Sequence, residues 1–293
     1  MGVVFLYSAW TKLDTLQKFE YTLVEYLHFS WLMAAVGARL LIGMEAALGV
    51  LLIFNLLGRN KWVPKLAVAS LIIFSIYLVF LWVYEGNDVN CGCFGDKIAM
   101  TPAQSLLKNA GMLAVLLLIN RYHKGLLYNR LNYVWLGVFS IIVVLPMFLY
   151  ALPDTNPQWL KKEKFKLDVS SLYSEGKNDI PTVKLDSGKY ILSFFSLGCP
   201  HCRIAAYKMH LMKESNPSLP FFMVLAGKKE NESGFWKETK AQNIPYTTLE
   251  ANSFTNLVGW SWPVIYWMNN GWVEARGNYV TLNQQEIEEW LKH

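Results

Sequence analysis

Residues 194–202 read Phe-Phe-Ser-Leu-Gly-Cys-Pro-His-Cys, and this stretch decides the fold of the second half of the chain. The apolar run before it, from Lys189 to Phe195, predicts a buried strand, and the residues after it, as far as Lys213, predict a helix. Cys199 then lies at a helix N-terminus, where backbone N–H groups and the helix dipole stabilise a thiolate. The pattern predicts a redox-active pair in which Cys199 is the nucleophile and Cys202 the resolving thiol.

The two residues between these cysteines favour the same chemistry. Pro200 suits the first turn of a helix, where its missing N–H is not needed. His201 adds positive character beside the sulfur, which favours the thiolate and makes the disulfide more oxidising. The alternatives are a buried inert pair and one half of a zinc site.

The residues after this pair predict the rest of an α/β domain. A second strand is expected over Phe221–Leu225. Strands over Val264–Met268 and Trp272–Ala275 flank Asn-Asn-Gly, which is a hairpin signal. A last helix is expected from Asn283, with Glu286 three residues later in the manner of a capping box.

Residues 165–293 resemble a thioredoxin-fold domain of the TlpA-like class. The marks are the Cys-Pro-His-Cys stretch and the later Ser261-Trp262-Pro263-Val264 before the hairpin. The resemblance implies that Pro263 is cis and lies against the active-site disulfide, and that Trp262 contacts the substrate backbone. The Pro-His dipeptide is like that of disulfide-introducing DsbA proteins, although TlpA-like domains often reduce their clients.

The first half of the chain has the composition of a membrane protein. Hydrophobic residues make up 53% of the chain, charged residues only 17%, and the mean hydropathy is +0.22. Four apolar runs are long enough to be read as membrane spans. Together with a shorter helix at the start of the chain they make five helices, and the last span is the fifth. These expected spans cover Trp31–Leu57, Leu66–Tyr84, Ala103–Ile119 and Tyr133–Leu152.

The opening run, Val3–Trp10, is too short to cross alone. Either it continues as helix through the polar residues after it, or part of the first span is missing. The run continues into Thr11 and Lys12 without a small-residue cleavage site, so we expect no cleaved signal peptide.

Basic loops predict the orientation of the spans, because Lys and Arg in short loops stay on the cytoplasmic side. The loops around Arg59 and Arg121 are basic, whereas the loop over residues 85–102 has a single Lys97. We therefore expect Cys91 and Cys93, and everything after Leu152, on the extracytoplasmic side of a bacterial inner membrane. Both cysteine pairs would then share the oxidising compartment.

Cys91-Gly92-Cys93 is the second redox motif. Two cysteines one residue apart close a small ring, and Gly92 allows the backbone angles that this closure demands. Such a disulfide is a good oxidant. The alternative is thiolate ligation of zinc or copper. The next helix is expected to begin at Thr101-Pro102-Ala103-Gln104, which reads as a capping box.

Residues 1–150 resemble the MauE branch of the DoxX-like membrane proteins. The resemblance rests on Asn90-Cys91-Gly92-Cys93-Phe94-Gly95 and, more diffusely, on the opening Phe5-Leu6-Tyr7-Ser8-Ala9-Trp10-Thr11-Lys12. It implies a role in disulfide formation or in the maturation of extracytoplasmic partners. Other DoxX relatives imply a link to quinone reduction.

Charged residues inside the expected spans are candidates for function, because charge is costly within a bilayer. Arg39 and Glu45 are six residues apart, so they face different sides of one helix and need separate partners. Lys12 is a candidate partner for Glu45. Lys12, Arg39 and Glu45 are thus candidates for a quinone headgroup site, and the alternative is a structural ion pair. Gly37, Gly43 and Gly49 predict close approach of neighbouring helices.

The prediction is an all-α transmembrane bundle of four helices plus a fifth linking helix, followed by an α/β thioredoxin-like domain. The expected boundaries are 1–130 for the bundle, 131–162 for the fifth helix and linker, and 163–293 for the extracytoplasmic domain.

The expected function is a relay of thiol–disulfide exchanges between client proteins or thiol carriers, Cys199–Cys202, Cys91–Cys93 and a membrane quinone. Membrane lipid is an expected partner, whereas nucleic acid and a bound metal are not expected. Two alternatives stay open: a maturation factor that supplies reductant, and a metal-binding assembly chaperone that uses both cysteine pairs.

Overall fold

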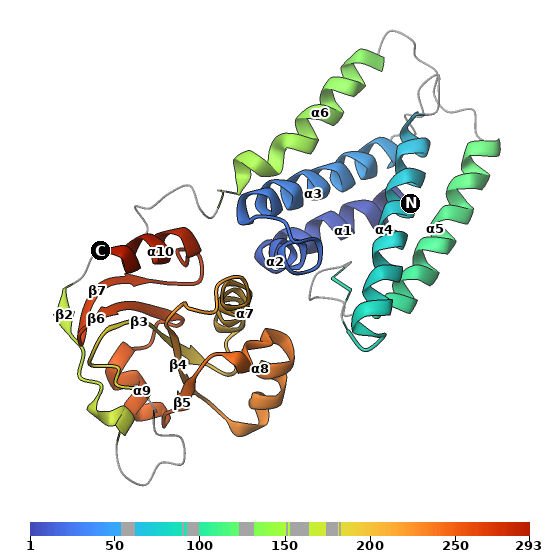
Figure 1. Ribbon diagram of the computed structural model, residues 1–293. Helices are drawn as coiled ribbons and strands as arrows, with labels where there is room; N and C mark the ends of the chain where they lie inside the picture. Colours follow the sequence, from blue (N-terminus) through green and yellow to red (C-terminus); the bar gives the residue numbers. More distant parts are fainter. Residues whose placement is uncertain are drawn as a thin grey trace. The chain divides into compact units, whose positions relative to one another are not determined.

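A computed structural model describes residues 1–53, 62–89, 91–92, 100–122, 132–150, 152, 164–173, 181 and 183–293. The chain forms two compact units, Met1–Leu152 and Pro153–His293 (Figure 1). The first is helical and the second is α/β, which confirms the predicted fold class. The positions at which the expected domains were divided, 130/131 and 162/163, lie outside the described residues.

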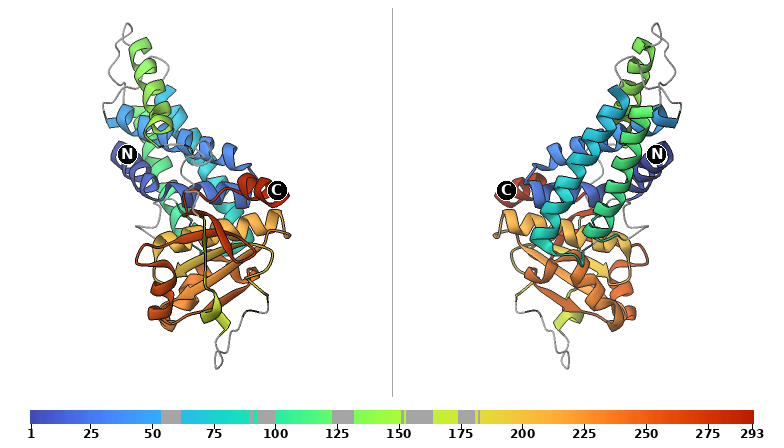
Figure 2. Two further views of the ribbon diagram at one scale, coloured as in Figure 1. Left: turned by 90° about the vertical axis from the view of Figure 1, so that its left-hand side faces the viewer. Right: turned by 90° about the vertical axis from the view of Figure 1, so that its right-hand side faces the viewer.

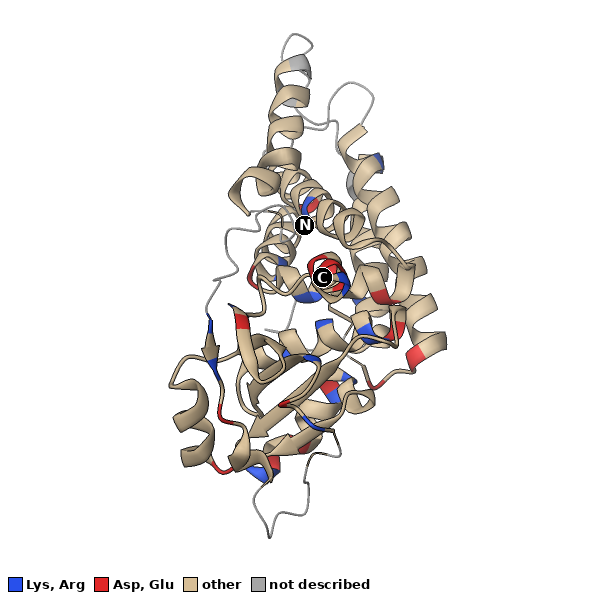
Figure 3. Cartoon of the chain, turned by 60° about the vertical axis from the view of Figure 1, so that its left-hand side comes forward, with Lys and Arg blue, Asp and Glu red and all other residues tan. Residues whose placement is uncertain are grey.

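The helices of the first unit agree with the predicted spans. Their bounds are α1 (Gly2–Asp14), α2 (Leu16–Leu27), α3 (Trp31–Ile53), α4 (Trp62–Glu85), α5 (Pro102–Tyr122) and α6 (Asn132–Leu149). Of these, α3 and α4 are long and apolar enough to cross a membrane, and α5 and α6 contain shorter apolar stretches. Lys, Arg, Asp and Glu are sparse along α3 to α6 (Figure 3).

The opening of the chain continues as helix through its polar residues. Helix α1 runs through Thr11 and Lys12 to Asp14, as the first of the two alternatives expected. Only Thr15 separates α1 from α2, and its N–H donates to the carbonyl of Lys12 at 3.2 Å. The sequence did not predict α2 as a separate helix, because lysine and glutamate interrupt its apolar residues.

Glycines on α3 allow two neighbouring helices to approach closely. A Cβ atom built on Gly43 would lie 2.1 Å from the backbone oxygen of Val143 on α6, and one on Gly49 would lie 2.7 Å from the Leu6 side chain on α1. A Cβ on Gly37 would make only ordinary contacts, the nearest at 3.8 Å. The predicted close approach is therefore confirmed at Gly43 and Gly49 and was wrong at Gly37.

Replacing Gly43 with alanine is expected to destabilise the helical unit by roughly 1–3 kcal/mol, because the new methyl group would push α6 away from α3. The measurement is the thermal unfolding midpoint of the full chain in detergent. Gly111→Ala on α5 is the matched control, since nothing lies within 4 Å of a Cβ at that site. An equal midpoint for the two variants would contradict the proposed close packing.

The second unit is built on a six-stranded mixed sheet in the order β2-β7-β6-β3-β4-β5. Strands β3, β4 and β5 are parallel, and β6, β7 and β2 continue the sheet in antiparallel pairs. The strand bounds are β2 (Phe165–Lys166), β3 (Lys189–Ser196), β4 (Phe221–Ala226), β5 (Tyr246–Thr248), β6 (Val264–Asn269) and β7 (Trp272–Gly277). All four strands predicted from the sequence are present.

Helices cover both faces of this sheet (Figures 1 and 2). Side chains alternate along β3. Phe194 packs edge-to-face on Phe254 of α9 (Ala251–Val258), with ring centroids 5.8 Å apart. Ser193, one residue earlier, points the other way and donates to the sulfur of Met209 on α7 (Pro200–Ser215) at 3.3 Å. The strand before Cys199 is thus buried on both faces.

Two further helices complete the unit. α8 (Glu232–Thr239) packs beside α7. α10 (Gln284–Lys292) begins at Asn283, whose side chain accepts from the N–H groups of Gln285 and Glu286. This N-cap confirms the predicted start of the last helix, whereas α8 and α9 were not predicted.

Candidate redox site

Cys199 is the N-cap residue of α7, as predicted. Its sulfur accepts a hydrogen bond from the backbone N–H of Cys202 at 3.3 Å, and Pro200 occupies the first helical turn. The loop before it is held by Arg203, whose guanidinium donates to the carbonyl of Leu197 at 2.9 and 3.1 Å. The geometry places a partly exposed sulfur where helix N–H groups stabilise negative charge.

The two sulfurs of this pair differ sharply in environment. A hydrogen bond from the Cys202 thiol, N–H groups of the first turn and the charge of His201 together lower the pKa of Cys199 to about 6, although burial opposes the shift. Burial raises the pKa of Cys202, which is fully enclosed. Cys199 is therefore the thiolate near neutral pH, and Cys202 keeps its proton until Cys199 has reacted.

The rate at which iodoacetamide alkylates Cys199 is expected to rise with pH through a midpoint near 6, well below the ordinary thiol pKa of 9.0. Because folding lowers the pKa of Cys199, its thiolate stabilises the folded, reduced protein. This contribution is complete above pH 9 and is lost as the pH falls to about 6. The measurement is a pH–rate profile by mass spectrometry in a chain with serine at positions 91 and 93.

Two variants at position 202 test the hydrogen bond from the Cys202 side chain, which is the largest cause of the lowered Cys199 pKa. Cys202→Ala removes the side-chain donor and is expected to move the midpoint toward 9, whereas Cys202→Ser keeps a hydroxyl donor and should move it less. A wild-type midpoint near 9 would contradict the assignment.

Tyr279 is a site residue that sequence analysis missed. Its ring stacks on the exposed imidazole of His201, with ring centroids 4.6 Å apart and planes 18° from parallel. Tyr279 lies between β7 and α10, far from Cys199 in the sequence. The stack holds the imidazole of His201 in place at the start of α7. No local pattern in the sequence signals the pairing.

Tyr279→Ala is expected to make the Cys199–Cys202 disulfide several-fold less oxidising in equilibrium with glutathione, because the imidazole loses the ring that holds it. Tyr279→Phe retains an aromatic face and is the matched control, for which the equilibrium constant should stay close to that of wild type. If both variants behave alike, the stack has no influence on the pair.

The residues expected to contact substrate lie at the same edge of the sheet as Cys199. The peptide bond between Trp262 and Pro263 is cis, as the resemblance implied. Val264 pairs with Phe194, so the start of β6 adjoins the end of β3. The indole of Trp262 donates to the carbonyl of Gly259 at 3.0 Å, which holds the ring in place. The exposed Trp260 lies beside it, 6.5 Å away between ring centroids.

The membrane motif is described only in part, because Cys93 lies outside the described residues. Cys91 is buried, and its sulfur lies 2.9 Å from the hydroxyl of Ser105 on α5. The predicted capping box that begins α5 is confirmed: Thr101 N–H donates to Gln104 at 3.1 Å and Gln104 N–H donates to the Thr101 hydroxyl at 3.3 Å. Ser105 follows directly and is a contact that sequence analysis did not identify.

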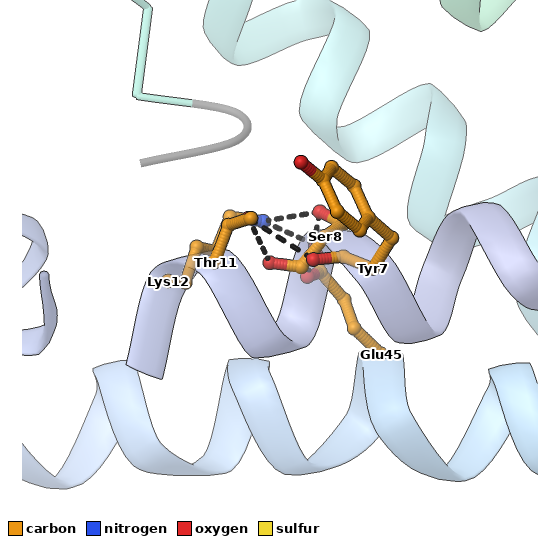
Figure 4. A network of polar contacts seen from close by, with 5 residues as sticks. All are labelled: Tyr7, Ser8, Thr11, Lys12 and Glu45. Carbon is orange, nitrogen blue, oxygen red and sulfur yellow. Dashed lines mark hydrogen bonds and ion pairs between the residues drawn. The ribbon is translucent and has the colours of Figure 1, made fainter. Parts of the chain in front are cut away.

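Lys12 and Glu45 form a buried ion pair between α1 and α3, as suggested from the sequence. The ammonium lies 2.5 Å from the carboxylate, and the two side chains are 5% and 4% exposed. Ser8 completes the cluster, since its hydroxyl donates to Glu45 at 3.1 Å and accepts from Lys12 at 3.2 Å (Figure 4).

Arg39 belongs to a different cluster, which confirms that Arg39 and Glu45 need separate partners. Its guanidinium pairs with Glu20 on α2 at 2.5 Å and donates to the carbonyls of Ala35 at 2.8 Å and Tyr150 at 3.0 Å. These bonds tie α2 and the end of α6 to α3. The structure therefore does not bring Arg39 together with Lys12 and Glu45 as one site.

A known protein family matches the first part of the chain. Residues 1–120 match the model of the family described as methylamine utilisation protein MauE. Residues 1–120 form a MauE domain. It contains α1 to α4, most of α5 and the Cys91 motif. The apolar helices and the MauE domain indicate a membrane protein.

Most of the chain is similar to the protein TlpB of Flavobacterium psychrophilum, with 28% identity over 88% of this chain and 83% of that protein. Similar solved structures cover the second unit. A secreted Mycobacterium tuberculosis disulfide oxidoreductase homologous to E. coli DsbE is 14% identical over 36% of this chain and 81% of its own, with a TM-score of 0.29. StoA from Bacillus subtilis is 15% identical over 44% and 96%, with a TM-score of 0.31.

The second unit has an α/β thioredoxin-like fold. Its strand β3, the Cys-x-x-Cys pair at the start of α7 and the cis proline before β6 stand in the order and places of a TlpA/DsbE-like thioredoxin domain.

Proposed function

We propose that this chain is a membrane thiol–disulfide oxidoreductase that introduces disulfides into extracytoplasmic client proteins. The observation that carries the proposal is the Cys199 sulfur at the N-terminus of α7, partly exposed and held as a thiolate above a fully buried Cys202. A reduced form stabilised in this way makes the corresponding disulfide a good oxidant. Client oxidation is therefore the favoured direction.

The first exchange takes place at the soluble pair. A client thiolate attacks Cys199 of the disulfide, forms a mixed disulfide, and releases Cys202 as a thiolate that takes up a proton. The second client thiol, after losing its proton, displaces Cys199, so the client gains one disulfide and the pair is left reduced, with Cys199 as the thiolate and Cys202 as the thiol. Trp262 and Pro263, at the same edge of the sheet, are the residues proposed to contact the client backbone.

The second exchange restores the oxidant. The reduced Cys199–Cys202 pair passes two electrons and two protons to the Cys91–Cys93 disulfide, which becomes a dithiol. A membrane quinone is the proposed final acceptor, because it takes two electrons and two protons together and dissolves in the bilayer. Ser105, 2.9 Å from Cys91, is positioned to exchange a hydrogen bond with that thiol. Both pairs are proposed to face the extracytoplasmic space.

The redox state of the four cysteines in membranes tests this relay. With quinone present, alkylation mass shifts should show Cys199–Cys202 oxidised in wild type and reduced in Cys91→Ser, because the variant cannot reoxidise the soluble pair. If the soluble pair stays reduced in wild type with and without quinone, the oxidase proposal fails and the reductant alternative takes its place.

A Cys202→Ser variant supplies the control for the metal-binding alternative. An exchange enzyme that cannot resolve its intermediate accumulates mixed disulfides with clients through Cys199, and these are released by dithiothreitol. A metal-binding chaperone would instead lose metal and trap nothing.

A further inference from the structure

Cys91 of the membrane motif is enclosed by apolar side chains. It is 6% exposed and packs in a cluster with Leu78 and Leu81 of α4, with Met100 and Leu106 at the border of the cluster. Its N–H donates to the carbonyl of Met100 at 3.0 Å, which holds the residue close to the start of α5. Thiol–disulfide exchange depends on access to the sulfur that is attacked. The packing around Cys91 leaves an incoming thiolate little room to reach this sulfur.

The hydroxyl of Ser105 is bonded to this sulfur rather than to its own helix. Its oxygen lies 2.9 Å from the sulfur of Cys91, and Ser105 is fully buried. Other helical hydroxyls of the same unit, those of Thr22, Ser75 and Ser140, donate to the carbonyl four residues earlier. Among the described residues, Cys91 is the one hydrogen-bond partner of the Ser105 hydroxyl. A buried hydroxyl is thus available to the sulfur.

Within the described part of the chain, the backbone N–H groups at the start of α5 already have acceptors. Pro102 has no N–H to donate. The next three N–H groups are bonded at 3.0 to 3.3 Å to Asn87 or Thr101, and they belong to Ala103, Gln104 and Ser105. At the start of α7, by contrast, a backbone N–H donates to the sulfur of Cys199. At α5 the donor for the sulfur is therefore a side chain, that of Ser105.

A donor at a sulfur matters most when that sulfur leaves a disulfide. The leaving sulfur keeps the electron pair of the S–S bond and becomes a thiolate, and exchange is faster when this thiolate is more stable. A charged group among apolar side chains is costly unless it has a hydrogen-bond partner. Cys91 combines poor access with a donor, so its surroundings favour departure from a disulfide and oppose direct attack on it.

We propose that Cys91 is the leaving sulfur of the membrane pair and that Ser105 is a catalytic residue, which donates a hydrogen bond to that sulfur as it becomes a thiolate. The inference rests on the proposed function, in which Cys91 and Cys93 form the disulfide that accepts electrons. By elimination, the sulfur that is attacked is that of Cys93.

The step is balanced as follows for a donor that carries two thiols. The first donor thiolate bonds to the sulfur of Cys93, the Cys91–Cys93 bond breaks, and Cys91 keeps the electron pair while Ser105 donates to it. The second donor thiolate then displaces Cys93, so the donor gains a disulfide. Both cysteines end as thiols, because they take up the two protons that the donor thiols lost.

Single-cysteine variants test which sulfur is accessible. The full chain, in nanodiscs and with serine at positions 199 and 202, carries either Cys91→Ser or Cys93→Ser, and each variant is treated with oxidised glutathione. Mass spectrometry measures the rate at which the remaining cysteine forms a mixed disulfide. We expect Cys93 to react several-fold faster than Cys91, because Cys91 is enclosed. Equal rates, or a faster reaction at Cys91, would overturn the assignment.

The rate at which glutathione reduces the intact membrane pair tests Ser105. In the same background, Ser105→Ala is expected to slow reduction at least about tenfold, since a hydrogen bond to a charged group is lost. Ser75→Ala is the matched control, because the Ser75 hydroxyl bonds to the carbonyl of Leu71 on the neighbouring helix α4. Its rate should stay close to that of wild type. An unchanged rate in Ser105→Ala would exclude the catalytic role.

Combining Ser105→Ala with Cys91→Ser separates a chemical role from a structural one. Without Cys91 there is no leaving sulfur, so Cys93 should react with oxidised glutathione at the same rate whether residue 105 is serine or alanine. If Ser105→Ala slows this reaction as much as it slows reduction of the intact pair, the residue only shapes the start of α5, and the proposal fails.

These outcomes are separable from a failure of the proposed function. If quinone does not oxidise the cysteines in membranes but Ser105→Ala slows reduction by glutathione, the roles of Cys91 and Ser105 stand and the relay fails. If quinone oxidises all four cysteines and Ser105→Ala is reduced at the wild-type rate, the relay stands and these roles fail.

Discussion

A polar group that leaves water must find a partner, and both units of this chain are arranged around that requirement. In the MauE domain, Lys12 and Glu45 neutralise each other between α1 and α3, and Arg39 is satisfied by Glu20 and two backbone carbonyls. These bonds connect α1, α2 and the end of α6 to α3.

In the second unit, the polar group that needs partners is the sulfur of Cys199. The Cys199 thiolate is stabilised by the thiol and N–H of Cys202, and by the charge of His201. The strand that delivers Cys199 is buried on both faces, so the sulfur is held in place while remaining partly exposed. The reactivity of Cys199 therefore comes from partners at the start of α7. Cys202 is buried and stays protonated until Cys199 has reacted.

Much of the fold was predictable because the patterns that signal it are local. The apolar run before Cys199 predicted β3, the Asn-Asn-Gly turn predicted the β6–β7 hairpin, and the capping box predicted the start of α5. α2 was missed because its apolar face is interrupted by charges, one of which, Glu20, is buried as the partner of Arg39. The short α8 and α9 were also not predicted, since too few turns are present for a clear period.

The sequence by itself determined the two cysteine motifs, the apolar spans and the place of Cys199 at a helix N-terminus, because each depends on residues within a few positions of one another. It also limited Glu45 and Arg39 to separate partners, through the period of one helix. Only the tertiary structure decided that Tyr279 stacks on His201, that Ser105 meets Cys91, and that Lys108 and Asn109 share a cavity with Lys12. These contacts join distant segments, and packing of whole helices and strands brings such segments together where no local spacing can.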